Sequence, residues 1–484
     1  MLDPTVHRSL AAVLPAASLL TAPEDTKPYE CDGLTLYRER PAAVVLPDTE
    51  AQVVDVLKLC HLARVPVVAR GAGTSLSGGA LPNAQGVVLS LAKFRRILSI
   101  DPLARTAVVQ PGVRNLAISE AAAAFGLYYA PDPSSQIACS IGGNVAENAG
   151  GVHCLKYGLT VHNVRKLRAV LIDGEIVELG GDALDSAGYD LLALITGSEG
   201  LLAVITEITV KLLPKPQCAR VALAAFDDLE KAGAAVGAVI AAGIIPAGLE
   251  MMDQPATRAV EDFVHADYPL DAAAVLLVES DGVNEEVAAE MDEIKRVLTE
   301  SGATSIRVSK DEAQRLLFWS GRKAAFPAVG RISPDYYCID GTIPRRALPR
   351  VLSAIEAWSV EYGLRCANVF HAGDGNLHPL ILFDANVEGE SAKAVAFGDR
   401  ILGLCIEVGG TVTGEHGVGV EKLKTMCEQF GTEELAAFLR IKGAFDPQGL
   451  LNPGKAVPTL ARCAEFGRMR VHAGELRHPD IPRF

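Results

Sequence analysis

Short apolar segments alternate with amphipathic ones between residues 37 and 216. Residues 65–70 read Val-Pro-Val-Val-Ala-Arg, a β-branched run of the kind that forms buried strands. Residues 50–63 carry a helical pattern, and Asp48–Thr49 before them are suited to cap a helix N-terminus. Strands and helices of this kind, separated by many glycine turns, predict an α+β region that ends at the proline-rich stretch 211–217.

A second series of strands and helices runs from about 218 to 410. Apolar strands alternate there with amphipathic helices, which predicts an open sheet with helices packed on one face. The strands are expected near 219–226, 247–252, 273–280, 303–308 and 365–371, and the helices near 228–242, 284–300 and 345–362.

Two apolar stretches resemble export or membrane segments only in length. Ser9–Leu20 is interrupted by Pro15 and preceded by a single basic residue, Arg8, so an amphipathic N-terminal helix is expected instead of a signal peptide. Ala232–Leu249 is uncharged for 18 residues, close to the roughly 20 that a membrane span needs. Because it is mostly Ala and Gly and contains Pro246, we expect a buried helix followed by a strand, and no transmembrane segment.

Composition narrows the classes of partner. The net charge of −14 over 484 residues disfavours nucleic acids and anionic membrane surfaces as main partners. The ten cysteines are scattered without a Cys-x-x-Cys pair, which argues against a zinc ribbon or a ferredoxin-type cluster. Without a secretory signal, they are expected to be reduced thiols of a cytoplasmic protein.

A glycine-rich loop, residues 70–82, follows a predicted strand. Its four glycines allow backbone N–H groups to converge on phosphate oxygens, and the hydroxyls of Thr74, Ser75 and Ser77 add donors. No Gly-Lys-Ser/Thr follows, and Leu76 occupies the third glycine position of a Rossmann fingerprint, so both of those nucleotide motifs are excluded. The loop alone leaves a phosphate cradle and a glycine-rich surface turn both open.

Two further glycine-rich segments, residues 131–158 and 196–214, favour the cradle because their small residues let a flat cofactor lie against the backbone. The three segments, in this order, resemble the FAD-binding domain of the vanillyl-alcohol oxidase and para-cresol methylhydroxylase superfamily. The resemblance implies that the first loop holds the FAD pyrophosphate and that the second segment runs along the ribityl chain and the isoalloxazine ring. It implies non-covalent FAD, because the first loop lacks the histidine that attaches FAD in some members; His153 is the nearest alternative.

The FAD-binding residues that the resemblance implies come from all three segments and from the end of the chain. They are Arg70, Gly71, Ala72, Gly73, Thr74, Ser75, Gly78, Pro131, Ser140, Gly142, Gly143, Asn144, Asn148, Gly150, Gly151, Glu199, Gly200, Ile205 and Asn452.

Three histidines fall in two short glycine-rich motifs. His371 and His378 flank Ala-Gly-Asp-Gly-Asn-Leu between apolar runs, which predicts two strands joined by a tight turn, with the imidazoles brought together. Glu415 and His416 lie in the stretch 412–419, Val-Thr-Gly-Glu-His-Gly-Val-Gly. Two histidines and one carboxylate are a usual ligand set for a divalent metal that keeps open coordination positions. His416 would then lie next to a ligand without being one.

These motifs, with the closing Leu-Asn-Pro-Gly-Lys, resemble one branch of the same superfamily. The branch contains D-2-hydroxyglutarate dehydrogenase, cytochrome-type D-lactate dehydrogenase and the FAD-linked subunit of bacterial glycolate oxidase, and the resemblance covers nearly the whole chain. It implies that His371, His378 and Glu415 bind a divalent metal, Zn or Mn, and that His416 is the general base. Arg322 matches the substrate arginine of the branch, although a solvated helix charge is the alternative.

The implied reaction is the FAD-dependent oxidation of a small 2-hydroxy acid to the 2-oxo acid. A metal lowers the pKa of the hydroxyl, an imidazole accepts its proton and an arginine holds the carboxylate. Leu380 stands where 2-hydroxyglutarate dehydrogenases carry a polar or basic residue, and residues 334–344 offer no lysine, which favours a short monocarboxylate such as glycolate or D-lactate. Residues 334–345 resemble the glycolate oxidase subunit most, so glycolate is the first expected substrate. D-lactate or D-2-hydroxyglutarate is the alternative substrate. A metal-dependent hydrolase without flavin and a non-catalytic flavoprotein subunit of an electron-transfer complex are the other classes.

The resemblance further implies a complex with an iron–sulfur subunit and a second FAD-type subunit, in the cytoplasm and peripheral to the inner membrane through those partners. The expected domains are an N-terminal helical segment 1–36, an FAD-binding domain 37–217, a substrate-binding cap domain 218–410, a C-terminal segment 411–458 that completes the active site, and a tail 459–484.

Overall fold

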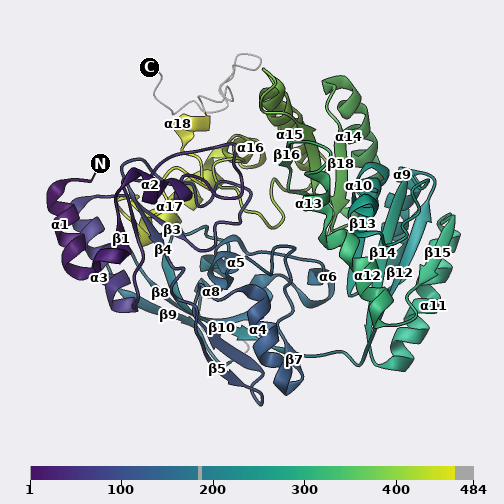
Figure 1. Ribbon diagram of the computed structural model, residues 1–484, viewed down its shortest axis with the longest axis horizontal. Helices are drawn as coiled ribbons and strands as arrows, with labels where there is room; N and C mark the ends of the chain where they lie inside the picture. The colour runs from purple at the N-terminus through teal and green to yellow at the C-terminus, as the bar shows by residue number, and fades with distance from the viewer. Residues whose placement is uncertain (1, 184–187, 464–484) are drawn as a thin grey trace. The chain divides into compact units, whose positions relative to one another are not determined.

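The computed structural model describes residues 2–183 and 188–463, and the chain divides into two compact units (Figure 1). Unit 1 contains the residues up to 150, residues 159–214 and the chain from 416 onwards; unit 2 contains residues 151–158 and 215–415. The chain therefore passes from one unit to the other after Gly150, Gly158, Pro214 and Glu415. The sequence analysis placed boundaries after 217 and 410 and none around the segment 151–158. Of the predicted tail, only the part up to Cys463 falls within the described residues.

The first sheet of unit 1 has three parallel strands and one antiparallel edge strand. In spatial order these are β1 (Leu19–Leu20), β2 (Ala43–Val45), β4 (Val87–Ser90) and β3 (Val67–Arg70). Leu451, close to the C-terminal end of the unit, forms a parallel bridge with Val67, so the Leu-Asn-Pro-Gly-Lys segment lies beside β3. This pairing brings a segment nearly 400 residues away to the strand that leads into the glycine-rich loop.

Helix α3 (Glu50–Ala63) has the predicted bounds. It begins after Thr49, whose hydroxyl accepts a hydrogen bond from Gln52 N at 3.3 Å. Helix α1 (Pro4–Val13) packs against it. The helix predicted over Ser9–Leu20 is wrong in extent, because the chain leaves the helix before Pro15 and Leu19–Leu20 form β1 instead.

The second sheet of unit 1 is antiparallel and has five strands. In spatial order they are β5 (Ile97–Asp101), β6 (Thr106–Val109), β10 (Val204–Lys211), β8 (Val164–Val170) and β9 (Ile176–Gly180). The remaining elements of unit 1 are α2 (Pro23–Thr26), α4 (Asn115–Ala122), β7 (Leu127–Tyr128), α5 (Ile141–Glu147), α7 (Thr160–Asn163), α8 (Leu191–Ile195), β11 (Leu213–Pro214), α16 (Leu423–Gln429), α17 (Thr432–Phe445) and α18 (Leu460–Cys463).

Unit 2 is built on a seven-stranded sheet whose neighbouring strands are antiparallel. In spatial order these are β15 (Ser305–Val308), β12 (Cys218–Phe226), β14 (Ala274–Gly282), β13 (Gly248–Asp253), β18 (Cys366–Phe370), β20 (Pro379–Phe383) and β16 (Asp335–Cys338). Every residue of β13 and β18 is buried, with no alternation along the strand, so both faces of the sheet are covered. The prediction that helices pack on one face is wrong for this reason.

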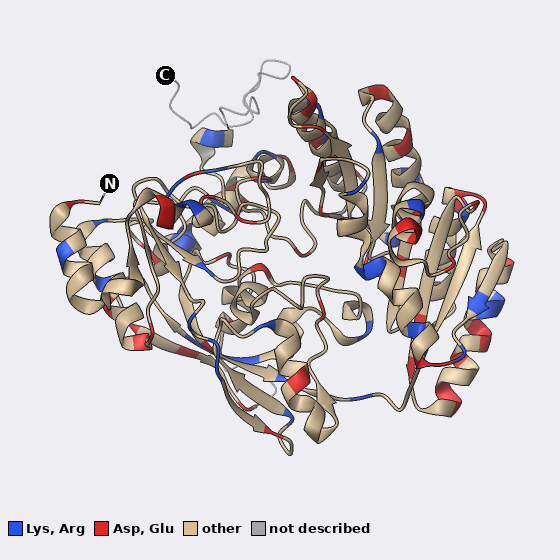
Figure 2. Ribbon diagram, in the orientation of Figure 1, with Lys and Arg blue, Asp and Glu red and all other residues tan. Residues whose placement is uncertain are grey.

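Two groups of helices surround this sheet. Helices α9 (Leu229–Ala241), α11 (Asn284–Glu300), α14 (Leu348–Tyr362) and α15 (Glu390–Glu407) form a connected series, and α10 (Gln254–Val264), α12 (Glu312–Lys323) and α13 (Ala325–Val329) form another. The unit also contains α6 (Cys154–Tyr157) and the two-stranded sheet of β17 (Gly341–Thr342) and β19 (Asn376–Leu377). Charged residues are frequent on the helices and rare in the strands of the large sheet (Figure 2).

Within the described residues, no helix is long and apolar enough to cross a membrane. The apolar stretch from Ala232 to Leu249 forms the end of α9 and the start of β13, as the sequence predicts. The expectation that all cysteines are reduced is wrong for two of them, because Cys427 on α16 and Cys463 on α18 form a disulfide. These cysteines are 36 residues apart, and they share a small buried cluster with Leu435 of α17.

Candidate active site

The glycine-rich loop leaves β3 at its carboxyl end and contacts the second glycine-rich segment within unit 1. Gly73 has a φ of +70°, which residues with a side chain rarely adopt. Gly71 approaches Ser140 so closely that a Cβ at position 71 would lie 2.2 Å from Ser140 Oγ. The same oxygen accepts a hydrogen bond from Ala72 N at 3.2 Å. The two segments that the sequence analysis assigned to FAD are thus joined through Ser140.

The second segment is also packed backbone to backbone. A Cβ at Gly142 would lie 2.5 Å from Cβ of Pro111. Asn144 is buried and accepts a hydrogen bond from Asn115 Nδ2 at 3.0 Å, and Asn148 ends α5 in the left-handed conformation. These glycines thus let the segments of unit 1 approach one another closely, and their small side chains are compatible with an extended, flat cofactor lying against the chain.

Arg70 and Asn452 have hydrogen-bond partners of their own. The guanidinium of Arg70 donates to Cys31 O at 2.7 Å and lies over the Tyr29 ring. The Asn452 side-chain amide donates to Gly79 O at 2.9 Å and to Glu199 O at 2.6 Å. Both side chains therefore tie distant parts of unit 1 to the glycine-rich loop.

The loop that carries His416 is anchored on the glycine-rich loop of the same unit. Ser75 Oγ donates to His416 O at 3.4 Å, and Ser77 O accepts hydrogen bonds from the two backbone N–H groups of residues 420–421. The two carboxylate oxygens of Glu199 accept hydrogen bonds from the backbone N–H groups of Val418 and Gly419, both at 2.7 Å. The predicted base is consequently held by the unit that contains the predicted FAD cradle.

The predicted metal ligands come together in unit 2. His371 follows β18 and His378 precedes β20, and their ring centroids are 5.1 Å apart, as the predicted turn requires. Glu415 Oε1 lies 3.1 Å from His371 Nε2 and 3.4 Å from His378 Nε2. Two imidazole nitrogens and one carboxylate oxygen thus converge within 4.8 Å of one another, a donor set that fits a divalent metal.

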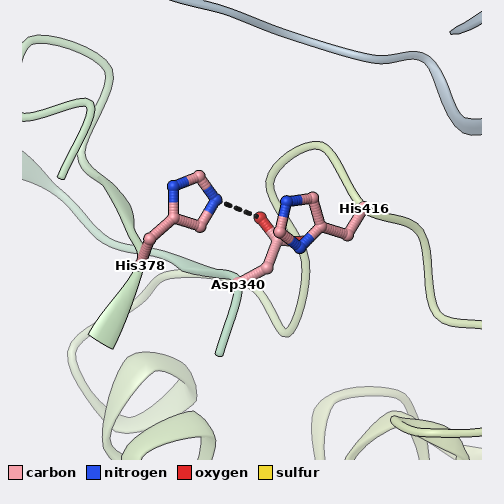
Figure 3. Close-up of side chains that lie close together, drawn as sticks. All are labelled: Asp340, His378 and His416. Atoms are coloured by element: carbon pink, nitrogen blue, oxygen red, sulfur yellow. Dashed lines mark ion pairs between the residues drawn. The ribbon is translucent and has the colours of Figure 1, made fainter. Parts of the chain in front are cut away.

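Asp340, which the sequence analysis did not single out, organises the loop that ends in Glu415. Its fully buried carboxylate accepts hydrogen bonds from Asn376 Nδ2 at 2.8 Å, Thr413 Oγ1 at 2.6 Å and the backbone N–H groups of Gly414 and Glu415, both at 3.1 Å. Figure 3 shows the carboxylate beside the His378 ring, and its Oδ1 lies 3.6 Å from His378 Nε2.

Arg322 is a buried residue of α12 and not a solvated helix charge. Its Nε donates to Glu250 Oε2 at 2.7 Å, and its Nη2 lies 3.5 Å from His371 Nδ1. Arg322 Nη1 is buried and has no hydrogen-bond partner among the described residues. A buried guanidinium donor without an acceptor is unfavourable, so a ligand is expected to supply one.

The carboxylates set the electrostatics of the cluster. Burial lowers the pKa of His371, but Glu250 and Glu415 on either side outweigh burial and raise the pKa to about 10. Burial also raises the pKa of Asp374, in the turn between the two histidines, to about 6. A divalent metal bound at His371 would have to compete with a proton on its ring.

The two units divide the predicted site residues between them. Unit 2 contains Gly151, Arg322, His371, His378 and Glu415, and unit 1 contains the other predicted FAD-binding residues and His416. His153, the alternative attachment point for FAD, lies in unit 2, where its Nε2 is 3.2 Å from Glu279 Oε1. Sequence reasoning missed Glu250 and Asp340. Glu250 could have been recognised as a candidate because it is the only charged residue in the apolar sequence Gly-Leu-Glu-Met-Met.

Comparison with known proteins identifies the family. The family model for an FAD binding domain matches residues 41–180, and the model for the C-terminal domain of FAD linked oxidases matches residues 215–456. The chain is 63% identical over 480 residues to the glycolate oxidase subunit GlcD of Escherichia coli (strain K12), covering 99% of this chain and 96% of that protein. It is 34% identical over 447 residues to a D-lactate dehydrogenase of Anaerostipes hadrus, covering 90% and 94%.

The fold has a counterpart among solved structures. A crystal structure of p-cresol methylhydroxylase with substrate bound superposes with a TM-score of 0.80 at 17% identity, covering 94% of this chain and 97% of that one. The predicted α+β fold is thereby confirmed, as is the resemblance based on the glycine-rich and histidine motifs. This chain belongs to the FAD-linked oxidases and is an FAD-dependent oxidoreductase.

Proposed function

We propose that the chain oxidises a short 2-hydroxy monocarboxylate to the 2-oxo acid, with glycolate as the first substrate and D-lactate as the second. The observation that carries the proposal is the buried Arg322, whose Nη1 has no partner in the described part of the chain, beside two histidines and a carboxylate. A guanidinium is suited to a carboxylate, and the neighbouring donor set is suited to a cation that binds a hydroxyl oxygen. The names of the two relatives support both substrates.

The residues that would hold the cation are His371, His378 and Glu415, and Zn or Mn is the expected ion. A bound divalent cation supplies a Lewis acid that lowers the pKa of the substrate hydroxyl. Arg322 binds the substrate carboxylate through Nη1, because its Nε is already taken by Glu250. The carboxylate and the hydroxyl of the substrate are thus oriented by neighbouring groups of one unit.

His416 is proposed as the general base that accepts the proton from the substrate hydroxyl oxygen on an imidazole nitrogen. FAD, when bound, would supply the acceptor for the hydride that leaves the substrate Cα. As the C–H and O–H bonds break, the carbon–oxygen double bond of the 2-oxo acid forms. The chain holds His416 for this step through Ser75 and positions the following residues through Glu199.

Leu380 supports a monocarboxylate over a longer dicarboxylate. It lies on β20, two residues after His378, which directly precedes the strand, so the two side chains point to the same side of the extended chain. Leu380 is fully buried and apolar, and a second carboxylate next to it would lose its hydration without gaining a partner. D-2-hydroxyglutarate is therefore the less favoured substrate.

The proposal includes non-covalent FAD bound by the glycine-rich segments and by the Leu-Asn-Pro-Gly-Lys segment. It also includes association with an iron–sulfur subunit and a second FAD-type subunit, which is supported because the relative from Escherichia coli is named as a subunit. A cytoplasmic location, with any contact to the inner membrane made through those subunits, completes it.

A dye-linked oxidation assay tests this function. The purified flavoprotein is offered glycolate, D-lactate, L-lactate and D-2-hydroxyglutarate, each with and without a chelator. Glycolate is expected to be oxidised fastest and the chelator to abolish activity. Failure to oxidise any of these acids would refute the proposed function, whereas full activity in chelator would refute the metal alone.

A further inference from the structure

Glu250 is a charged residue in the interior of an apolar strand. It lies on β13 and is only 1% exposed. A buried carboxylate is costly unless both of its oxygens are paired, and both are paired here. Oε1 lies 2.9 Å from His371 Nδ1, and Oε2 accepts the hydrogen bond from Arg322 Nε at 2.7 Å. One side chain therefore contacts a proposed metal ligand and the proposed substrate arginine together.

The sheet register places Glu250 at this point. Strands β13 and β18 are antiparallel, with Met251 opposite Phe370, so Glu250 lies beside His371, the next residue after β18. Because Glu250 takes His371 Nδ1, the opposite nitrogen of the ring, Nε2, points towards Glu415. Glu250 takes Arg322 Nε and Nη2 lies against His371, so Nη1 is the guanidinium nitrogen left without a partner among the residues that the structure describes.

We propose that Glu250 is a positioning residue that orients His371 towards the metal and Arg322 towards the substrate carboxylate. The inference rests on the proposed function and deepens it. Carboxylates that hold the second nitrogen of a ligating histidine fix the ring and raise its basicity as a ligand. Glu250 in addition links this ligand to the carboxylate-binding arginine, so disturbing it weakens binding of the metal and of the substrate.

The same sheet contains a matched control. Glu279 on β14 is also 1% exposed, and it also pairs with an arginine and a histidine. Arg315 Nη1 donates to its Oε2 at 2.8 Å, and His153 Nε2 lies 3.2 Å from its Oε1. Arg315 precedes Arg322 by seven residues, two turns of α12. Glu279 thus has similar chemistry and burial, but its partners are not among the proposed metal ligands.

The test compares Glu250→Gln with Glu279→Gln in the full-length flavoprotein. Affinity for Zn and for Mn is measured by competition with a chromogenic chelator, and affinity for oxalate, a non-oxidisable dicarboxylate, is measured by calorimetry on the metal-loaded protein. We expect Glu250→Gln to raise the metal dissociation constant by about 10- to 100-fold and to weaken oxalate binding. Glu279→Gln is expected to lower the melting temperature and to leave both affinities unchanged.

Equal metal affinity in the wild type and in Glu250→Gln would overturn the inference, as would an equal loss in both variants. If Glu250→Gln fails to fold, Glu250→Asp decides, because its carboxylate is withdrawn by one methylene and cannot reach both partners; unchanged metal affinity there overturns the inference. Absence of metal uptake by the wild type would overturn the metal assignment of the proposed function as well, which distinguishes the two failures.

Discussion

Removal of the Asp340 carboxylate is the sharpest test of how the loop leading to Glu415 is held. Asp340→Ala leaves the side-chain donors of Asn376 and Thr413 and two backbone N–H groups without their common acceptor. A hydrogen bond to a charged group contributes about 1.5–3 kcal/mol, but four bonds that share one acceptor are not additive. The expected loss is about 3–5 kcal/mol, because several buried neutral donors are left unsatisfied at about 1–3 kcal/mol each and their costs do not add in full.

The assay is thermal and urea unfolding of the FAD-bound protein, together with a metal titration. For a unit of roughly 200 residues, the loss corresponds to a fall in melting temperature on the order of 10 °C. Thr413→Val, which removes one donor, is expected to cost about 2 kcal/mol. Asp253→Ala is the control, because Asp253 is a buried carboxylate bonded to Asn368 and Ala256 N, outside the ligand cluster. Asp340→Ala with wild-type stability and wild-type metal affinity would refute the reasoning.

Three further predictions concern other parts of the chain. His416→Ala is expected to retain FAD, seen in the visible spectrum, and to lose turnover; loss of the flavin would instead make His416 structural. Burial raises the pKa of Glu279, but His153 and Arg315 outweigh burial and lower the pKa to about 2. At pH values above the unfolded-state pKa of about 4.5, the ion pairs of Glu279 therefore contribute about 3 kcal/mol to the free energy of unfolding. This stability is lost as the pH falls from about 4.5 towards 2, and acid unfolding curves of Glu279→Gln should be shallower in that range. Thiol titration in denaturant should count eight free thiols before reduction and ten after it; ten thiols without reduction would contradict the disulfide. The disulfide Cys427–Cys463 closes a loop across 36 residues. Its reduction should therefore lower the free energy of unfolding by about 4 kcal/mol.

Local elements were predictable from short-range patterns. The bounds of α3 followed from Thr49 and the helical periodicity after it, and the two strands around His371 and His378 followed from apolar runs on either side of a Gly-Asp-Gly-Asn turn. Capping and periodicity act within a few residues, so they can be read from the order of amino acids. The N-terminal helix was overextended because apolar character alone does not separate α1 from the short strand Leu19–Leu20.

The disulfide and the covering of both sheet faces could not be predicted in this way. Cys427 and Cys463 have no motif spacing, and they meet in a small buried cluster with Leu435 of α17, against which α18 packs. Strands β13 and β18 bury every residue, and short apolar runs of this kind do not show which elements cover each face. Both features depend on packing between elements far apart in the chain.

The sequence by itself determined the family, the cofactor and the candidate ligands His371, His378 and Glu415, because these residues stand in compact motifs whose chemistry depends on local spacing. Only the tertiary structure decided how they are held. Glu250 is 121 residues from His371, and Asp340 is 75 residues from Glu415. Such partners are chosen by strand register and by the requirement that every buried charge be paired, and neither leaves a pattern in the nearby sequence.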